Sequence, residues 1–264
     1  MGVLNITSNS FSDGGHYLNC QRACERALEM IRQGVDVIDV GGEASNPYGR
    51  YEMISVEEEL SRVIPVISAI RARSDVAISI DTCKAQVMEH AVAAGATMIN
   101  DIMALRGENA LSVAQRLQVP VCLMHMQGQP NTMQKAPCYP HGVVEEITQF
   151  FSERIEACLQ SGIPATRIIL DPGIGFGKTT SHNLTILKQL STFNQFKYPL
   201  LIGVSRKGFI GEVLDKSVSE RLIGGVAIAV YAMLQDVKII RTHDVDETRQ
   251  ALSMLEAIER DILG

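Results

Sequence analysis

Short runs of apolar, mostly β-branched residues recur along the chain, and the segments between them place apolar residues every three or four positions. The first pattern predicts buried strands, and the second predicts amphipathic helices. The runs cover residues 3–6, 37–40, 77–80, 98–99, 121–124, 168–170, 200–204 and 239–240. Because the runs are almost uniformly apolar and alternate with helices, we expect parallel strands that are buried on both faces. Eight such units favour an α/β fold, a single (β/α)8 barrel, over an open doubly wound sheet.

Helix boundaries are marked between these strands. We expect helices over 21–33, 85–94, 109–117, 143–160, 182–190 and 219–234. Ser55 and Glu58 have the spacing of a capping box and predict another helix start, and Pro65 should kink the helix that follows. A glycine comes one or two positions after three of the expected helices, where a left-handed residue commonly ends a helix; these are Gly34, Gly95 and Gly162.

Composition narrows the classes of function. Of the 264 residues, 46% are hydrophobic and 20% are charged, as in an ordinary globular protein, and we expect one domain over 1–264. The net charge of -6 gives no basic surface for nucleic acid, and the apolar stretch 224–234 is shorter than the ~20 residues that span a bilayer. Six cysteines without a C-x-x-C pair indicate reduced thiols and a cytoplasmic protein.

A polar residue stands at or just after the end of each predicted strand. In a barrel these positions converge on one mouth, where catalysis takes place in this architecture. One such residue alone is most simply the start of a loop, but eight in register predict a polar site. The residues are Asn5, Glu43, Asp81, Asn100, His125, Asp171, Ser205 and Arg241.

The residue types at this mouth indicate two kinds of ligand. Asp81, Asn100 and Asp171 offer the donors and acceptors that a flat, nitrogen-rich heterocycle needs. Arg241 and His243 are two positions apart, so their side chains point the same way and, with Asn5 on the neighbouring first strand, form a candidate anion clamp.

The glycine-rich segment 171–179 superficially looks like a nucleotide-binding loop. Pro172 stands where a P-loop needs glycine, and Lys178 stands where the dinucleotide motif needs glycine. We therefore expect these glycines to allow close approach of the backbone to a flat ligand.

Longer motifs at the strand ends resemble those of the dihydropteroate synthase family of TIM-barrel, pterin-binding enzymes, and the resemblance extends down the whole chain. The motifs are MGVLNIT at 1–7, SFSDGG at 10–15, DVGGE at 39–43, SIDT at 79–82, INDI at 99–102, LMHMQG at 123–128, LDPG at 170–173, GFGK at 175–178, SRK at 205–207 and RTHD at 241–244. Each motif alone is weak, whereas the set is specific.

The resemblance implies that p-aminobenzoate condenses with 6-hydroxymethyl-7,8-dihydropterin pyrophosphate to give 7,8-dihydropteroate and pyrophosphate in folate synthesis. It also implies Mg2+ as cofactor, a homodimer, and a pocket that sulfonamides target. The implied catalytic residues are Asp81, Lys207, Arg241 and His243. The implied pterin contacts are Asp81, Asn100, Met124, Asp171 and Lys207; the pyrophosphate contacts are Asn5, Ser45, Arg241 and His243, with Mg2+ on Asn5; and the aminobenzoate contacts are Ser45, Pro47, Phe176, Lys207 and Gly208.

Three places depart from the family pattern. Ser8 and Asn9 replace the usual Pro-Asp, and the segment 44–48 replaces Ser-Thr-Arg-Pro-Gly, so that Asn46 stands in place of an arginine. Asparagine cannot replace the bidentate contact of a guanidinium. Gly208 stands where a serine is common. These departures concern the aminobenzoate pocket and leave the pterin and pyrophosphate residues intact.

Three alternatives stay open at this point. A methyltetrahydrofolate-type methyltransferase also binds a pterin but has no pyrophosphate to hold, so the Arg241 and His243 pair argues against it. A Schiff-base aldolase could use Lys207 as its nucleophile. A non-catalytic paralogue would bind the pterin without turnover.

Overall fold

The computed structural model describes residues 1–6, 15–43, 54–129 and 132–260. In this part of the chain strands and helices alternate, as the sequence predicts. The strands are β1 Gly2–Asn5, β2 Val37–Gly41, β3 Ala77–Asp81, β4 Met98–Asp101, β5 Val121–Met124, β6 Ile168–Asp171, β7 Leu201–Gly203 and β8 Ile239–Arg241.

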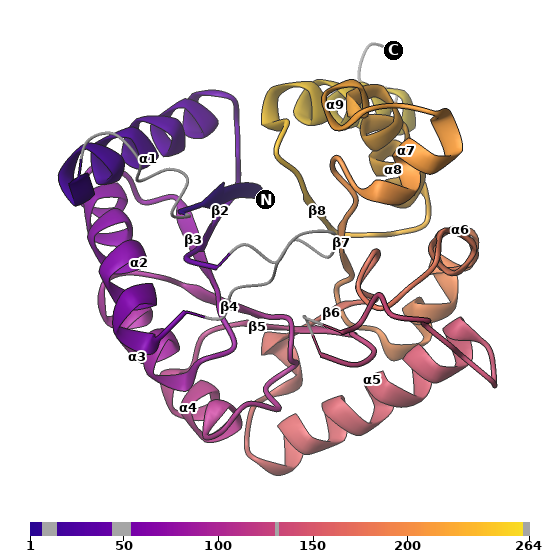
Figure 1. The fold of residues 1–264 in the computed structure, drawn as a ribbon, viewed down its shortest axis with the longest axis horizontal. Helices are drawn as coiled ribbons and strands as arrows, with labels where there is room; N and C mark the ends of the chain where they lie inside the picture. Colours follow the sequence, from indigo (N-terminus) through magenta and orange to yellow (C-terminus); the bar gives the residue numbers. More distant parts are fainter. Residues whose placement is uncertain (7–14, 44–53, 130–131, 261–264) are drawn as a thin grey trace.

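The helices form an outer ring around the strands (Figure 1). They are α1 Gly15–Arg32, α2 Val56–Arg71, α3 Ala85–Ala93, α4 Ala110–Leu117, α5 Val143–Gln160, α6 Thr180–Lys188, α7 Gly208–Leu214, α8 Leu222–Leu234 and α9 Val245–Arg260, with the short 3-10 helices Ala165–Arg167, Leu190–Phe196 and Val218–Glu220. Among the described residues, none of these helices is long and apolar enough to cross a membrane.

The strands close into a cylinder. A parallel ladder joins β1 through β6 in chain order, and a second parallel ladder joins β7 to β8. Parallel bridges connect the two ladders at Leu170–Leu200 and at Gly2–Thr242. The second connection is reinforced because the Val3 amide donates to the Thr242 carbonyl at 2.9 Å and the Thr242 amide donates to the Met1 carbonyl at 3.0 Å. The predicted (β/α)8 barrel is confirmed, and the open sheet is wrong.

Helix boundaries differ from the predictions where capping or glycine content decides them. Ser55 Oγ accepts from the Glu58 amide at 3.2 Å, which confirms the predicted start of α2, and α2 continues past Pro65. The sixth helix begins at Thr180 rather than 182 because the Thr179 side chain caps it. The eighth begins at Leu222 rather than 219, after the 3-10 turn. Helix α7 was not predicted, because Gly208 and Gly211 weaken its helical signal.

The barrel interior is built in two layers. Its lower layer is an apolar cluster of residues from five segments, namely Met1, Met98, Cys122, Ile169 and Leu201, with Val37 and Ile239 packed against it. Side chains two positions apart on a strand point to the same side. The residues that follow two positions later therefore form the next layer, and these are Val3, Asp39, Asn100, Met124, Asp171, Gly203 and Arg241. The apolar layer is the floor on which the polar site lies.

Candidate active site

An ion-pair cluster joins strands β2, β3 and β8 above the apolar floor. Arg241 Nε donates to Asp39 Oδ2 at 2.6 Å, and Arg241 Nη2 donates to Asp81 Oδ2 at 2.8 Å. Asn100 Nδ2 also donates to Asp39 Oδ2, at 3.2 Å. The structure thus brings three of the predicted site residues, Asp81, Asn100 and Arg241, into one network with a fourth residue, Asp39.

The charged groups in this cluster shift the pKa values of Asp81 and Arg241. Burial and the neighbouring Asp39 charge raise the pKa of Asp81, against the opposing effect of Arg241. Burial disfavours the charge on Arg241, but the two carboxylates outweigh it and raise its pKa. One fixed cation therefore balances two carboxyl groups, and the raised pKa of Asp81 makes that group easier to protonate than an exposed aspartate.

Asp39 is the site residue that sequence reasoning missed. Its side chain is fully buried, and its Oδ1 has no hydrogen-bond partner among the described residues. The signal was present, because an aspartate stands inside the apolar run 37–40. A buried carboxylate in a strand needs a charged partner, which makes such a residue a better candidate than one at a loop start.

A second group of site residues surrounds the loop after β6. Asp171 Oδ1 accepts from the Gly173 amide at 2.8 Å, and burial raises the pKa of Asp171. Lys207 Nζ donates to the Ile174 carbonyl and lies 4.5 Å from the centroid of the Phe176 ring. Burial lowers the pKa of Lys207 to about 7, although Asp171 acts in the opposite direction. Lys207, Asp171 and Phe176 therefore belong to one side of the mouth.

The two groups face one mouth. The ladder register pairs Asp81 with Asn100 and, further round the barrel, Met124 with Asp171, so the members of each pair are direct neighbours on adjacent strands. The Arg241 charge lowers the pKa of both Asp81 and Asp171, so both carboxyl groups lie within its electrostatic reach. The predicted convergence of acidic side chains is therefore found.

Three glycines of the β6 loop have positive φ angles but do not all serve the purpose that we expected. A Cβ on Gly173 would lie 1.9 Å from the His125 carbonyl oxygen, and one on Gly177 would lie 2.6 Å from the Gln127 carbonyl oxygen. Gly175 instead faces Lys207, whose Cδ would lie 3.0 Å from an added Cβ. Two of these close approaches are therefore to the neighbouring β5 loop, which accounts for Gly173 and Gly177 without a ligand.

Lys178 is buried between the same two loops. Its Nζ contacts His125 Nδ1 at 3.0 Å, the Phe176 carbonyl at 3.0 Å and the His125 carbonyl at 3.3 Å. Burial lowers the pKa of Lys178 well below its usual value, and burial followed by the Lys178 charge lowers the pKa of His125 to about 2. His125 is therefore a neutral acceptor that holds a lysine, rather than the free strand-end group that we expected.

The remaining strand-end residues have separate surroundings. Asn5 has an exposed side chain at the end of β1, and Oδ1 lies 3.5 Å from the point where a Gly41 Cβ would stand. Glu43 pairs with Lys84, which also contacts the buried Glu59 at 2.6 Å.

Three further predictions concern the walls of the site. Met124 and Phe176 are buried in one apolar cluster with Ile102, Met126 and Met133. Gly208 is the first residue of α7, directly after Lys207. The predicted contacts Ser45 and Pro47 lie outside the described residues.

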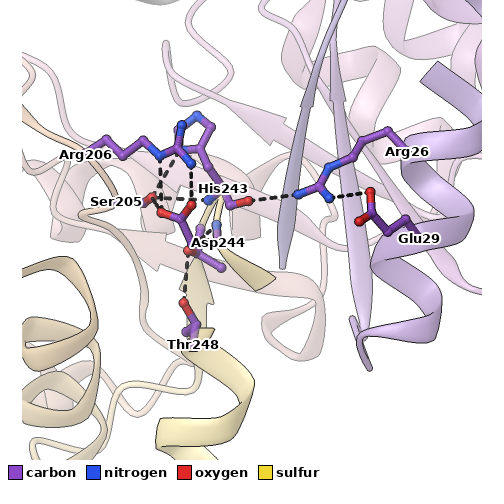
Figure 2. Close-up of polar contacts among 8 residues, drawn as sticks. Arg26, Glu29, Ser205, Arg206, His243, Asp244 and Thr248 are labelled. Carbon is purple, nitrogen blue, oxygen red and sulfur yellow. Dashed lines mark hydrogen bonds and ion pairs between the residues drawn. The ribbon is translucent and has the colours of Figure 1, made fainter. Parts of the chain in front are cut away.

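His243 stands beside Ser205 rather than on the carboxylate cluster (Figure 2). Its Nδ1 lies 3.1 Å from Ser205 Oγ, and its carbonyl accepts from Arg26 Nη2 at 3.2 Å. Burial, followed by the Arg241 and Arg206 charges, lowers the pKa of His243 to about 4. Of the predicted anion clamp, Arg241 is held by carboxylates and His243 is a neutral imidazole at pH 7.

This geometry is compatible with a ligand that has a flat polar part and an anionic part. Acceptors and donors at Asp81, Asn100 and Asp171 lie next to an apolar wall that contains Met124 and Phe176. The cationic side chains of Arg241 and Lys207 lie beside these carboxyl groups.

Comparison with known proteins agrees with this geometry. The model of a family described as "Pterin binding enzyme" matches residues 1–243. The dihydropteroate synthase of Escherichia coli strain K12 is 49% identical over 257 residues, which are 97% of this chain and 90% of that protein.

Two solved structures share the fold and the sequence. The Yersinia pestis dihydropteroate synthase in a sulfonamide drug complex has a TM-score of 0.93 and 45% identity, covering 98% of this chain and 94% of that one. The Xanthomonas albilineans enzyme with 4-aminobenzoic acid has a TM-score of 0.91 and 42% identity, covering 98% and 92%. These similarities show that the chain is an enzyme, a transferase, that belongs to the dihydropteroate synthase family of pterin-binding enzymes.

Proposed function

We propose that this enzyme condenses 6-hydroxymethyl-7,8-dihydropterin pyrophosphate with p-aminobenzoate and releases 7,8-dihydropteroate and pyrophosphate. The observation that carries the proposal is the polar group above the apolar floor. Asp81 accepts from Arg241, Asn100 joins the same network through Asp39, and Asp171 lies within electrostatic reach of the guanidinium. A buried polar site of this kind discriminates strongly for a ligand that pairs all its edges, because any other ligand leaves groups unpaired.

The pterin would lie against the apolar wall with its polar edge toward the acidic side chains. Asp171 Oδ1 already accepts one backbone amide, which leaves Oδ2 to accept from a ring N–H or amino group. Asn100 and Lys207 are placed to meet the other polar atoms, and Met124 and Phe176 supply apolar contact. Asp81 would stabilise the positive charge that develops on the pterin methylene.

The pyrophosphate would bind at Arg241 and His243. Nε and Nη2 of Arg241 are engaged by carboxylates, which leaves Nη1 without a partner in the described part of the chain and available to phosphate oxygens. Because the guanidinium is held in place before the substrate arrives, it needs no reorganisation when negative charge develops on the leaving group.

The residues present fit Mg2+ that is carried mainly by the substrate. Among the described residues, no group of three or more His, Cys, Asp or Glu side chains could form a protein cage for a metal ion. Asn5 offers an exposed amide oxygen at the mouth, and Mg2+ is commonly bound by one or two protein oxygens with phosphate oxygens and waters. Mg2+ bound there would neutralise charge on the pyrophosphate.

The reaction requires no protein nucleophile. The C–O bond between the pterin methylene and the pyrophosphate breaks, and its electron pair leaves with the pyrophosphate. The arylamine nitrogen of p-aminobenzoate bonds to the methylene carbon and loses a proton. Phe176, Lys207 and Gly208 would border the aminobenzoate, with Ser45 and Pro47 contributed from outside the described residues. The bound 4-aminobenzoic acid of the Xanthomonas albilineans relative supports this second substrate.

Pyrophosphate release tests the proposal. We expect release only when both the pterin substrate and p-aminobenzoate are present, together with stoichiometric dihydropteroate. The Asp171→Asn variant should lose most of this activity, because an amide offers one acceptor oxygen where the carboxylate offers two. Methyl transfer without pyrophosphate release would support the methyltransferase instead. Binding of the pterin without product would support the non-catalytic paralogue, and a borohydride-trapped adduct on Lys207 would support the aldolase.

We also propose a cytoplasmic homodimer. All six cysteines are free thiols, which suits a reducing compartment. Large apolar side chains are exposed on α8 and α9, with Ile223 81% exposed and Ile258 69% exposed. Such exposed apolar surface is typical of a protein interface. Sedimentation should give a dimer, and Ile223→Glu should shift it toward monomer; a monomeric wild type would rule out the homodimer.

A further inference from the structure

The carboxylate of Asp244 connects the ends of β7 and β8 (Figure 2). Arg206 contacts both of its oxygens, with Nε donating to Oδ2 at 3.2 Å and Nη2 donating to Oδ1. The Ser205 hydroxyl donates to Asp244 Oδ2 at 3.3 Å. Although burial acts in the opposite direction, Arg206 lowers the pKa of Asp244, so the group is an ionised carboxylate at pH 7. An ionised carboxylate only accepts hydrogen bonds.

Counting protons at Ser205 then determines the proton position on His243. The Ser205 hydroxyl has one hydrogen. It donates this hydrogen to Asp244 Oδ2, because the ionised carboxylate has no hydrogen to donate. Its oxygen accepts from the His243 backbone N–H at 3.2 Å. The other lone pair faces His243 Nδ1 at 3.1 Å, and this contact is a hydrogen bond only if Nδ1 carries the proton. Nε2 of His243 has no partner among the described residues.

We infer that Ser205 and Asp244 are positioning residues that hold His243 as the Nδ1–H tautomer, so that Nε2 is an unprotonated nitrogen available to the ligand. In histidine sites the tautomer is set by the hydrogen bond that the other ring nitrogen makes. The order of groups is Asp244, Ser205, His243, with the hydroxyl in the middle. This differs from a nucleophilic triad, in which the imidazole lies between the carboxylate and the hydroxyl, so Ser205 is not a nucleophile.

The surrounding backbone keeps this chain of groups in place. Arg206 has a φ of 60°, an uncommon conformation for a non-glycine residue, and its carbonyl accepts from Arg221 Nη1 at 3.1 Å. The Asp244 amide donates to Thr242 Oγ1 at 3.0 Å, and Arg26 of α1 fixes the His243 carbonyl. These contacts hold the backbone on both sides of the group, and the Ser205 hydroxyl cannot turn away without losing its contacts with Asp244 Oδ2, the His243 N–H and His243 Nδ1.

A consequence follows for the proposed pyrophosphate site, and this step alone rests on the proposed function. An unprotonated Nε2 cannot donate to a phosphate oxygen, so we expect His243 to take up a proton from solvent at Nε2 when pyrophosphate binds. The charged groups around the ring in the free protein are Arg241, Arg206 and Lys207, which oppose protonation, and Asp244, which favours it. A bound pyrophosphate would add the negative charge that makes protonation favourable.

Long-range proton–nitrogen NMR of 15N-histidine-labelled protein tests the tautomer directly. His243→Gln identifies the His243 signals among those of the six histidines. At pH 7 the wild type should show Nδ1 protonated and Nε2 unprotonated. Ser205→Ala should shift the ring toward the Nε2–H form, and Ser205→Thr, which keeps a hydroxyl, should restore Nδ1–H. An Nε2–H signal in the wild type, or an unchanged ring in folded Ser205→Ala, would overturn the inference.

Titration of the same samples with inorganic pyrophosphate and Mg2+ tests the ligand step. The wild type should become doubly protonated at His243 on saturation, and Ser205→Ala should bind pyrophosphate about fivefold more weakly, the equivalent of one net hydrogen bond. Calorimetric binding without a change at His243 would refute the ligand step. Absence of any pyrophosphate binding would instead refute the proposed function, while the tautomer result would stand.

Discussion

Two buried cations near the mouth of the barrel are held in opposite ways. Arg241 lies between the carboxylates of Asp39 and Asp81, whereas Lys178 lies among two carbonyl oxygens and the neutral His125 ring. The carboxylates raise the pKa of Arg241, and burial lowers that of Lys178. The Arg241 side chain is 19% exposed and Lys178 is 1% exposed, and the direction of each pKa shift follows the charge of the partners. The first arrangement presents a permanent cation to a ligand, and the second fastens two loops together.

The largest effect should come from Arg241→Met. Removing the guanidinium leaves two carboxylates buried without a counter-charge, which should cost about 3–5 kcal/mol of unfolding free energy at pH 7. The loss should be smaller at pH 5, because carboxyl groups without a cation protonate more easily. Urea unfolding at both pH values measures this. Adding Asp81→Asn should recover part of the loss, and no recovery would show that the cost is not electrostatic.

Lys178→Met should cost less, about 1–3 kcal/mol, because the acceptors that it leaves are neutral. Because burial holds the folded pKa of Lys178 well below 10.5, the unfolded chain binds more protons than the folded chain below that pH, so the cost of Lys178→Met should rise with pH. The cost of Arg241→Met should fall when the pH is lowered to 5. Lys178→Arg is the matched variant that keeps a cation in the same place. A loss as large as that of Arg241→Met would remove the distinction between the two cations.

Lowering the pH should reduce the unfolding free energy, because His125 is held neutral beside Lys178 in the folded protein. The folded pKa of His125 is about 2, below its usual 6.5, so between these values the unfolded chain binds a proton that the folded chain does not. Stability from this group is complete above pH 6.5 and falls as pH falls, by up to about 1.4 kcal/mol per pH unit. The difference in unfolding free energy between wild type and His125→Gln should follow this slope. A difference that does not vary with pH from 6.5 to 4 would contradict it.

The smallest expected effect comes from alanine at Gly175, which lies beside a third cationic side chain, Lys207. Gly175 and Gly34 have φ angles of +83° and +84°, and a Cβ on Gly175 would meet Lys207 at 3.0 Å, whereas one on Gly34 would meet Arg249 at 3.7 Å. Alanine at either position should cost about 1 kcal/mol of stability because of the backbone strain. Only Gly175→Ala should also reduce the rate of pyrophosphate release. Equal activity in the two variants would mean that Lys207 tolerates displacement.

The sequence predicted the fold well because strand identity here depends on local composition. Each strand is a short apolar run, and every predicted run overlaps an observed strand. The polar ends of the strands were also predictable, because the parallel arrangement brings them to one side. The assignment of 1–264 to one domain stays a prediction, as do the roles of the site residues.

Side-chain partners were less predictable than positions. Asp39 was overlooked because strand-end residues were the candidates, and it lies two positions earlier. The bond between Lys178 and His125 joins residues 53 positions apart, and no local pattern encodes the way in which two loops pack. Glu43 and His125 were predicted at the mouth, yet Lys84 and Lys178 engage them.

The cylinder wall consists of a six-stranded ladder and a two-stranded ladder, and Arg241 belongs to the smaller one while Asp39 and Asp81 belong to the larger. The guanidinium therefore links the two ladders inside the barrel, in addition to the bridges Leu170–Leu200 and Gly2–Thr242. A ligand that competes with the carboxylates for Arg241 would also weaken this link between the ladders. Ligand binding and the stability of the barrel wall therefore depend on the same atoms.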